Sequence, residues 1–82
     1  MKLEDGKKYL LFDNIYNCHL IGIFIKRERG IGDLNYFKIV AICDKKRDTS
    51  YPYKPFLNDI YLYHKDEVIK ELSDEEVMLE IL

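Results

Sequence analysis

The chain has no tryptophan, no glutamine, two cysteines, two prolines and four glycines among its 82 residues. No segment approaches the roughly 20 consecutive apolar residues that a membrane-spanning helix needs. The first eight residues alternate in charge and lack the apolar stretch of a secretory signal peptide. We therefore expect no membrane contact and no export, and a cytoplasmic protein whose two thiols are reduced.

Residue types that carry chemistry are few and poorly spaced. Cys18, His19, Cys43 and His64 can bind zinc, but they form no C-x-x-C or H-x3-H pair. Cys18 and His19 are adjacent, so they would point to opposite faces of a strand. Both cysteines lie in apolar runs, where burial keeps a thiol inert. We therefore expect no metal site, no cofactor and no enzymatic activity.

What the chain has in abundance is apolar surface. Hydrophobic residues make up 48% of it and aromatic residues 13%. A chain of this length forms one domain with one modest core. We infer that part of the apolar surface contacts a partner or a second copy. Ile, Lys, Tyr, Asp and Glu dominate, as is typical of AT-rich genomes such as those of many phages.

Charge is split along the chain. Residues 1–65 carry twelve lysines and arginines against eight acids, whereas residues 66–82 carry one lysine against seven acids. A body of about +4 therefore precedes a tail of about −6. We place the β-rich body at about residues 7–64 and an acidic helical tail at about residues 66–82, within a single domain.

The apolar pattern predicts short strands at Lys8–Asp13, Cys18–Arg27, 35–44 and 60–63. The second and third are apolar on both faces, which is typical of strands covered on both sides. In the second strand, one face would carry His19, Ile21, Ile23 and Ile25, and the other Cys18, Leu20, Gly22 and Phe24. In the third strand, one face would carry Tyr36, Val40 and Ile42, and the other Phe37, Ile39, Ala41 and Cys43.

The C-terminal segment is predicted to be helical from Ser73. Ser73 and Glu76 have the spacing of a capping box. The apolar stripe Val77, Met78, Ile81 and Leu82 is predicted to dock on the sheet. Residues 66–72 fit either a short helical turn or a last strand that closes a small barrel, and we favour the helix.

These elements predict an α+β, mainly β fold: a small curled antiparallel sheet of three to five strands with a short C-terminal helix. The rhythm of short strands, one long loop at residues 45–55 and a terminal helical turn resembles that of SH3-like and Sm-like partial barrels. The resemblance covers about residues 8–72 and rests on strand spacing alone.

We interpret the chain as a small non-catalytic module that binds another protein. Tyrosine suits interfaces because it offers a large rigid contact area with a polar tip. Opposed charges would help to steer the partner. The predicted partner-binding residues are Tyr51, Tyr53 and Phe56, a basic rim of Lys45, Lys46 and Arg47, and an acidic rim of Glu71, Asp74, Glu75 and Glu76.

One specific form of this function is a phage or mobile-element accessory protein that inhibits a host defence complex, as anti-CRISPR proteins do. An alternative is a small barrel that binds nucleic acid through basic strand ends and tyrosines. The sequence pI near 5.6 argues against that alternative. A third is a self-assembling protein, such as a homodimer, whose two-sided strands continue across copies.

Overall fold

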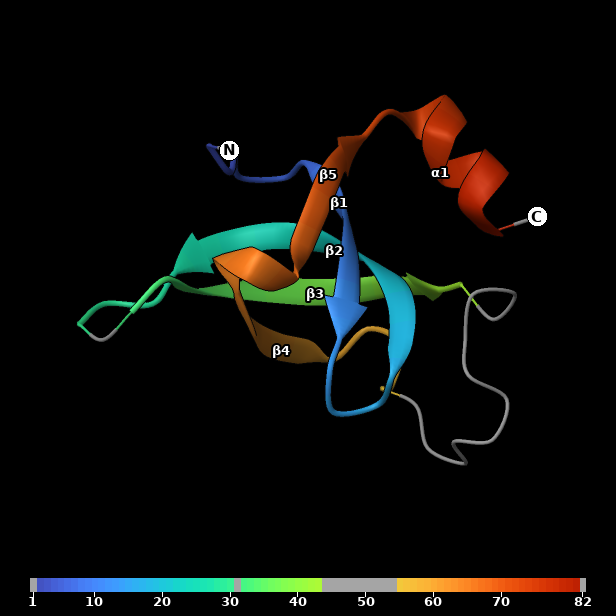
Figure 1. Cartoon of the computed structure of the whole chain (residues 1–82). Helices are drawn as coiled ribbons and strands as arrows, with labels where there is room; N and C mark the ends of the chain where they lie inside the picture. The colour runs from blue at the N-terminus through green and yellow to red at the C-terminus, as the bar shows by residue number, and fades with distance from the viewer. Residues whose placement is uncertain (1, 31, 44–54, 82) are drawn as a thin grey trace.

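The protein folds as a five-stranded antiparallel open sheet that ends in a short helix (Figure 1). The computed structural model describes residues 2–30, 32–43 and 55–81. The strands are β1 (Lys8–Asp13), β2 (Cys18–Arg27), β3 (Leu34–Ile42), β4 (Ile60–His64) and β5 (Val68–Leu72). A 3₁₀ turn, η2 (Lys65–Glu67), joins β4 to β5, and helix α1 (Asp74–Ile81) follows.

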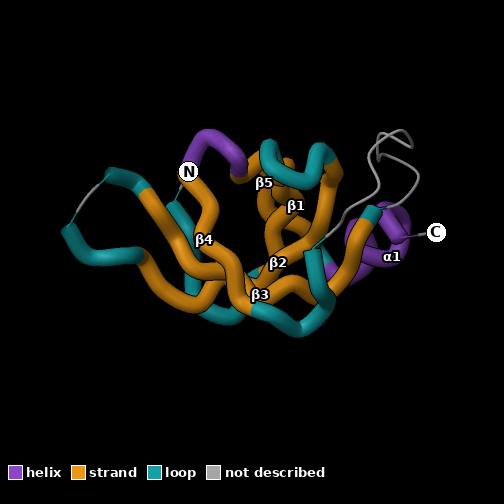
Figure 2. Tube along the Cα trace, turned by 90° about the horizontal axis from the view of Figure 1, so that it is seen from below, coloured by secondary structure: helices purple, strands orange, loops and turns teal. Residues whose placement is uncertain are grey.

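The strand order is β4-β3-β2-β1-β5. The first four strands form a meander, and β5 returns to pair antiparallel with β1, so that Lys8 lies opposite Leu72. Figure 1 shows β1 and β5 crossing β2 and β3 steeply, and Figure 2 shows the same curl from below. The predicted bounds of β1 and β2 are confirmed, and β3 and β4 lie within two residues of their predictions.

The favoured helix at residues 66–72 is wrong, because Val68–Leu72 forms strand β5. Within residues 66–72, helical geometry is confined to the two residues that belong to η2. His64 caps this turn: its Nδ1 accepts from the Asp66 amide at 3.1 Å, while the Glu67 carboxylate accepts from the His64 amide at 3.0 Å. The apolar spacing of this segment fits either structure. Pairing with β1, distant in sequence, satisfies the backbone of β5 and decides the outcome.

One face of the curled sheet encloses the inner core. Phe37 lies at its centre and makes edge-to-face contacts with Tyr9, Phe24 and Tyr63 at centroid separations of 6.0, 5.7 and 6.2 Å. Each such pair stabilises the folded state by about 0.5–1.5 kcal/mol in addition to the effect of burying its surface. The buried members of the inner core are Tyr9, Leu11, Cys18, Leu20, Phe24, Phe37, Ile39 and Tyr63.

Gly22 makes this packing possible. A Cβ atom at Gly22 would lie 2.9 Å from both the Leu11 Cδ1 and the Phe37 Cβ atoms. Real Cβ atoms do not approach other carbon atoms so closely, so any larger residue would push β1 or β3 outward. The glycine therefore sets the spacing at the middle of the sheet.

A bulge in β3 corrects the predicted faces of that strand. Ile21 pairs with Ala41 while the next residue, Gly22, pairs with Ile39, so Val40 is an extra residue. Beyond the bulge the alternation of side chains reverses. Ile42 consequently packs on the inner core, and Cys43 joins the opposite face, contrary to the predicted grouping with Phe37.

The opposite face carries a smaller outer cluster of four buried residues, which are Leu10, Ile21, Cys43 and Leu72. Val77 of α1 packs against this cluster. The predicted capping box is confirmed: the Glu76 amide donates to Ser73 Oγ and the Ser73 amide donates to Glu76 Oε1, both at 3.2 Å. Both faces of the central strands are thus apolar and at least partly covered, as their sequences indicate.

A buried carboxylate organises the β1–β2 turn. Asp13 is only 4% exposed. Its Oδ1 accepts from the amides of Ile15 and Tyr16 at 2.8 Å each, and its Oδ2 accepts from the Tyr63 hydroxyl at 2.6 Å. Burial, and then the hydrogen bond to Asp13, raises the pKa of Tyr63 well above its ordinary value. This contact ties the first turn to β4.

Candidate partner-binding surface

Five of the predicted contact residues lie outside the described residues: Lys45, Lys46, Arg47, Tyr51 and Tyr53. Of the predicted apolar contacts, the structure therefore places only Phe56. Its side chain is 70% exposed, and its amide donates to the Tyr61 hydroxyl at 3.1 Å. The hydroxyl of Tyr61 thus holds the turn before β4, while the ring of Phe56 faces solvent.

Phe56 begins a line of exposed apolar residues that we name the β4 edge residues. They are Phe56, Leu57, Ile60 and Leu62, with exposed fractions of 70, 54, 57 and 40%. Within β4, exposure alternates: Tyr61 and Tyr63 turn towards the core, while Ile60 and Leu62 turn away from it. Outward positions of such a strand are usually polar.

The position of β4 in the sheet adds to this exposure. β4 is the last strand in the order and pairs only with β3 among the described strands. An apolar edge strand is a surface to which another chain can add, and proteins ordinarily protect such edges with charges or proline. The sequence contains this signal, because the run from Ile60 to Tyr63 is apolar at every position, but these residues are not among the predicted contacts.

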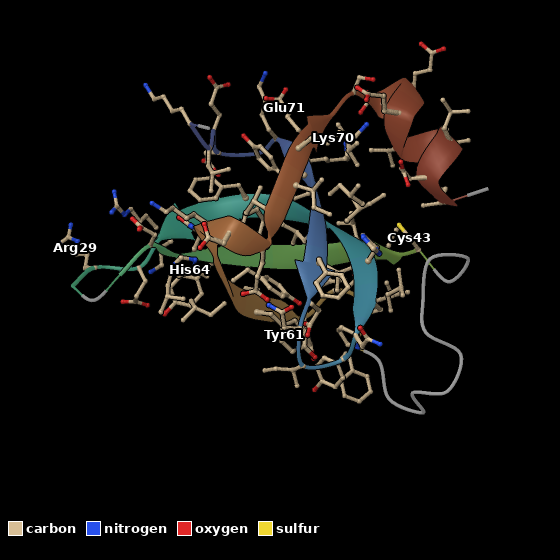
Figure 3. All side chains as sticks on the ribbon, in the orientation of Figure 1. Arg29, Cys43, Tyr61, His64, Lys70 and Glu71 are labelled. Carbon is tan, nitrogen blue, oxygen red and sulfur yellow. The ribbon has the colours of Figure 1, made fainter. Side chains whose placement is uncertain are left out.

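The predicted acidic rim is brought together where β5 joins α1. Glu71 lies 3.4 Å from Lys7, Asp74 lies 3.1 Å from Lys8, and Glu76 lies 3.4 Å from Lys70. In Figure 3 the Lys70 side chain lies on the side of β5 that faces α1, and Glu71 lies on the side of the N-terminal segment. Glu75 is exposed on the first turn of α1. Three of the four carboxylates are therefore partly neutralised, so the rim is a set of surface ion pairs as well as an acidic surface.

The pKa values of two groups in these ion pairs, Glu76 and Lys7, are shifted. Hydrogen bonds from Ser73, its backbone amide above all, lower the pKa of Glu76, and the nearby Lys70 adds to the effect. Hydrogen bonding to Glu4, together with the charges of Glu71 and Glu4, raises the pKa of Lys7. Both groups lie at the surface, where solvent and salt screen such interactions.

The prediction that the stripe of α1 docks on the sheet holds for Val77 alone. Met78 and Ile81 are 55% and 46% exposed, as is Leu79 at 63%, while Leu82 lies outside the described residues. None of the described residues of α1 is buried. Apart from its surface ion pairs, the helix therefore packs on the sheet through the apolar side chain of Val77, and its more exposed apolar residues face solvent.

Basic residues gather at the other end of the molecule, around the β2–β3 hairpin. Arg29 marks the tip of this hairpin in Figure 3. Lys26 lies 5.4 Å from the centre of the Tyr36 ring, a cation–π contact. The Tyr36 hydroxyl donates to Glu28, and this hydrogen bond raises the pKa of Tyr36. The hairpin thus combines cations with an aromatic ring.

The thiols and imidazoles are distributed over different strands and turns of the sheet. Cys18 and Cys43 are buried, belong to different clusters and form no disulfide. His19 packs edge-on against Phe12 at 5.1 Å, and His64 caps η2. Among the described residues, no three potential metal ligands lie together. Each imidazole therefore has an evident packing or capping role.

Within the described ranges, no helix has both the length and the apolar character needed to cross a membrane. A scan against protein-family models, a search of curated proteins and a search of solved structures found nothing that matches this chain.

Proposed function

We propose that the chain is a small non-catalytic module that binds another protein through the β4 edge residues. The observation that carries this proposal is the outward apolar face of β4, where Ile60 and Leu62 are exposed on a strand that pairs on one side only among the described strands. An exposed apolar strand at an edge offers both backbone hydrogen-bonding groups and side-chain contacts to a partner. Phe56 adds an aromatic side chain of the kind enriched in interfaces.

The distribution of charge supports the same proposal. Arg27, Arg29 and Lys26 lie around the β2–β3 hairpin, whereas Asp74 and Glu75 lie on α1 at the opposite side of Figure 1. A partner with complementary charges would be oriented during its approach, which chiefly raises the association rate. Inhibition of a host defence complex by a phage accessory protein is the specific form that we propose from the sequence composition.

We also propose that the open sheet is an SH3-like partial barrel. Support comes from the meander of β1 to β4, the 3₁₀ turn between β4 and β5, and the return of β5 to the side of β1. Small barrels of this kind serve many unrelated functions, so the binding proposal rests on the surface residues and takes nothing from the fold.

The function is tested by comparing matched variants in affinity capture. The tagged chain, an Ile60→Lys/Leu62→Lys variant and an Ile69→Lys control would be incubated with a host extract, and retained proteins quantified by mass spectrometry. Ile69 is 44% exposed on β5, at the opposite edge of the sheet. We expect the native chain and the control to retain the same protein, and the double variant to lose it.

Two results would contradict the proposal. One is a partner that the Ile60→Lys/Leu62→Lys variant retains as well as the native chain does. The other is a partner that the Ile69→Lys control loses to the same extent. Circular dichroism would verify that each variant keeps its β-sheet content.

Nucleic-acid binding is the second candidate, and the placement of Lys26 over Tyr36 beside Arg27 is the observation that favours it. Tyr36 is half-buried, and cations next to a partly accessible ring can hold a backbone and stack a base. Fluorescence anisotropy with a labelled single-stranded RNA would show an affinity that falls steeply between about 50 and 200 mM salt. Absence of any binding at the lower salt concentration would eliminate this candidate.

A further inference from the structure

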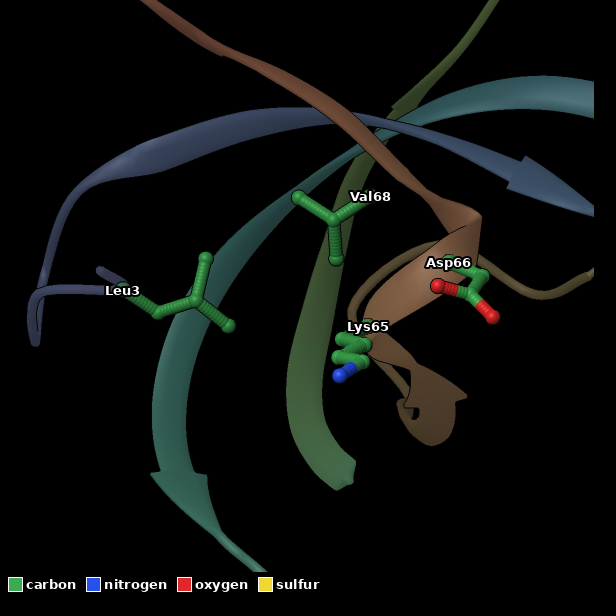
Figure 4. A pocket seen from close by; sticks show the side chains of 4 residues that line it. All are labelled: Leu3, Lys65, Asp66 and Val68. Carbon is green, nitrogen blue, oxygen red and sulfur yellow. The ribbon is translucent and has the colours of Figure 1, made fainter. Parts of the chain in front are cut away.

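A cleft opens where the N-terminal segment passes between the β2–β3 hairpin and η2. It consists of two adjoining hollows of about 460 Å³ and 270 Å³, both lined by Leu3 and Lys65. Figure 4 shows Leu3 and Val68 facing each other across the larger hollow, with Lys65 and Asp66 on η2. We name this feature the basic cleft, and none of the β4 edge residues lines it.

The basic cleft has an apolar lining and a cationic rim. Leu3, Val68 and Phe24 supply apolar surface continuous with the inner core. Cationic groups at its rim come from three different segments of the chain, namely Lys2, Arg27 and Lys65. A site of this kind suits a ligand that has an anionic group next to an apolar one.

Asp33 holds two of these cations in place. Its Oδ1 lies 3.1 Å from the Arg27 guanidinium and its Oδ2 lies 3.1 Å from Lys65 Nζ. The hydrogen bond to Lys65, with the charges of Lys65 and Arg27, lowers the pKa of Asp33. A single carboxylate thus positions two cations and can neutralise only one.

Both cations keep the capacity to bind a second anion. The Arg27 and Lys65 side chains are 67% and 60% exposed. A guanidinium has five N–H donors and an ammonium has three, so the contacts with Asp33 leave donors available to a ligand. Asp66 also lines the larger hollow, but it lies 3.4 Å from His64 Nδ1 and is 80% exposed. Counting Lys2, the cleft has three cations and two carboxylates.

We propose that the basic cleft binds an acidic segment of the partner protein, in which a carboxylate contacts Arg27 and Lys65 and a neighbouring aliphatic side chain lies between Leu3 and Val68. This inference rests on the proposed function and adds the chemistry that the partner presents. Charge complementarity selects the acidic residue, and the apolar lining selects the aliphatic one.

The test titrates the isotope-labelled full-length chain with short peptides and follows amide chemical shifts by NMR. The probe is acetyl-Leu-Glu-Glu-Leu-amide; the controls are acetyl-Leu-Lys-Lys-Leu-amide, which reverses the charge, and acetyl-Gly-Glu-Glu-Gly-amide, which removes the aliphatic groups. We expect saturable shifts at Leu3, Arg27, Lys65 and Val68 with the probe, and affinities at least tenfold weaker for both controls.

Substitutions show where the peptide binds. They also distinguish a failure of the cleft proposal from a failure of the proposed function. Lys65→Gln is expected to weaken probe binding about tenfold, a loss equivalent to one charge-assisted contact. Lys38→Gln, the same change at an exposed position of β3, is expected to leave it unchanged. The Ile60→Lys/Leu62→Lys variant should still bind the probe peptide while losing the captured partner.

Several outcomes would overturn the inference. These are equal binding of the acidic and basic peptides, shifts confined to the β4 edge residues, or no shift at millimolar peptide. Equal affinity for 4-methylpentanoate, a free aliphatic acid, would also overturn it, because the site would then bind a small molecule and gain nothing from a peptide. In each case partner capture that depends on Ile60 could persist, so the two proposals fail separately.

Discussion

The sheet and the C-terminal helix are held by different kinds of interaction. Phe37, fully buried between β2 and β4, contacts three other rings of the inner core. Helix α1 is held by Val77, a capping box at Ser73, and surface ion pairs such as that of Lys70 with Glu76. Burial stabilises far more than surface charge pairing does. We infer that α1 can open while the sheet remains folded, as weakly packed segments commonly do.

The largest expected effect on stability comes from a substitution in the inner core of the sheet. Phe37→Ala removes the central ring of the inner core and should lower the free energy of unfolding by about 3–5 kcal/mol. Phe56→Ala makes the same chemical change at a residue that is 70% exposed. It should alter the free energy of unfolding by less than about 0.5 kcal/mol. Urea denaturation followed by circular dichroism measures both. Comparable losses in the two variants would show that the inner core is misassigned.

A smaller effect is expected from the buried contact between Tyr63 and Asp13. Tyr63→Phe removes the hydroxyl that donates to Asp13 Oδ2. This change should lower the free energy of unfolding by about 1–3 kcal/mol near neutral pH. Because the folded state holds the proton of Tyr63 above its ordinary pKa of 10.0, this contribution is complete below pH 10 and is lost as pH rises further.

The difference in stability between the native chain and Tyr63→Phe should therefore narrow above pH 10. Urea denaturation at a series of pH values gives this difference. Tyr61→Phe serves as the control, since among the described residues the Tyr61 hydroxyl accepts from the exposed amide of Phe56 and contacts no buried carboxylate. A difference that stays constant up to strongly alkaline pH would contradict the assigned hydrogen bond.

For the helix we expect a local effect. Ser73→Ala removes the N-cap hydroxyl and should destabilise α1 by about 1 kcal/mol. If α1 opens separately, amide hydrogen exchange should accelerate within residues 74–81 and stay unchanged in β2 and β3. Uniform acceleration across the chain would instead show that sheet and helix unfold together.

The smallest expected effect is the response of α1 to acid. Its cap lowers the pKa of Glu76 below the ordinary value of 4.5, so the stabilisation is present above pH 4.5 and is lost as pH falls below it. Amide exchange in α1 should therefore accelerate below pH 4.5 once the intrinsic pH dependence is removed. Glu76→Gln keeps a side chain that can form the capping box but does not titrate. If exchange in α1 still accelerates below pH 4.5 in that variant, the acid response comes from carboxylates other than Glu76.

Local signals predicted much of this fold from the sequence. The β1 and β2 strands were found from their apolar runs, and the capping box at Ser73 was found from its spacing. The segment Val68–Leu72 was assigned wrongly because its pattern fits a helix and a strand equally well. Its strand conformation depends on pairing with β1, which no local pattern contains.

The candidate site was harder to predict. The bulge at Val40 reversed the side chains that follow it in β3, because one extra residue shifts the alternation without changing the composition. The outward face of β4 escaped notice because apolar residues on both sides of a strand normally indicate burial. The basic cleft joins Lys2, Arg27 and Lys65, which are far apart in the sequence and meet only through the curl of the sheet.

The pairing of β1 with β5 has a consequence for how the molecule forms. These strands are far apart in the sequence, so Lys8 meets Leu72 only after all the residues between them have been made. During synthesis the meander of β1 to β4 therefore emerges before β5 can flank β1. Closing so large a loop is an entropic obstacle, and proteins dominated by such non-local contacts fold in milliseconds to seconds. Until that closure, one side of β1 stays available to other nascent chains.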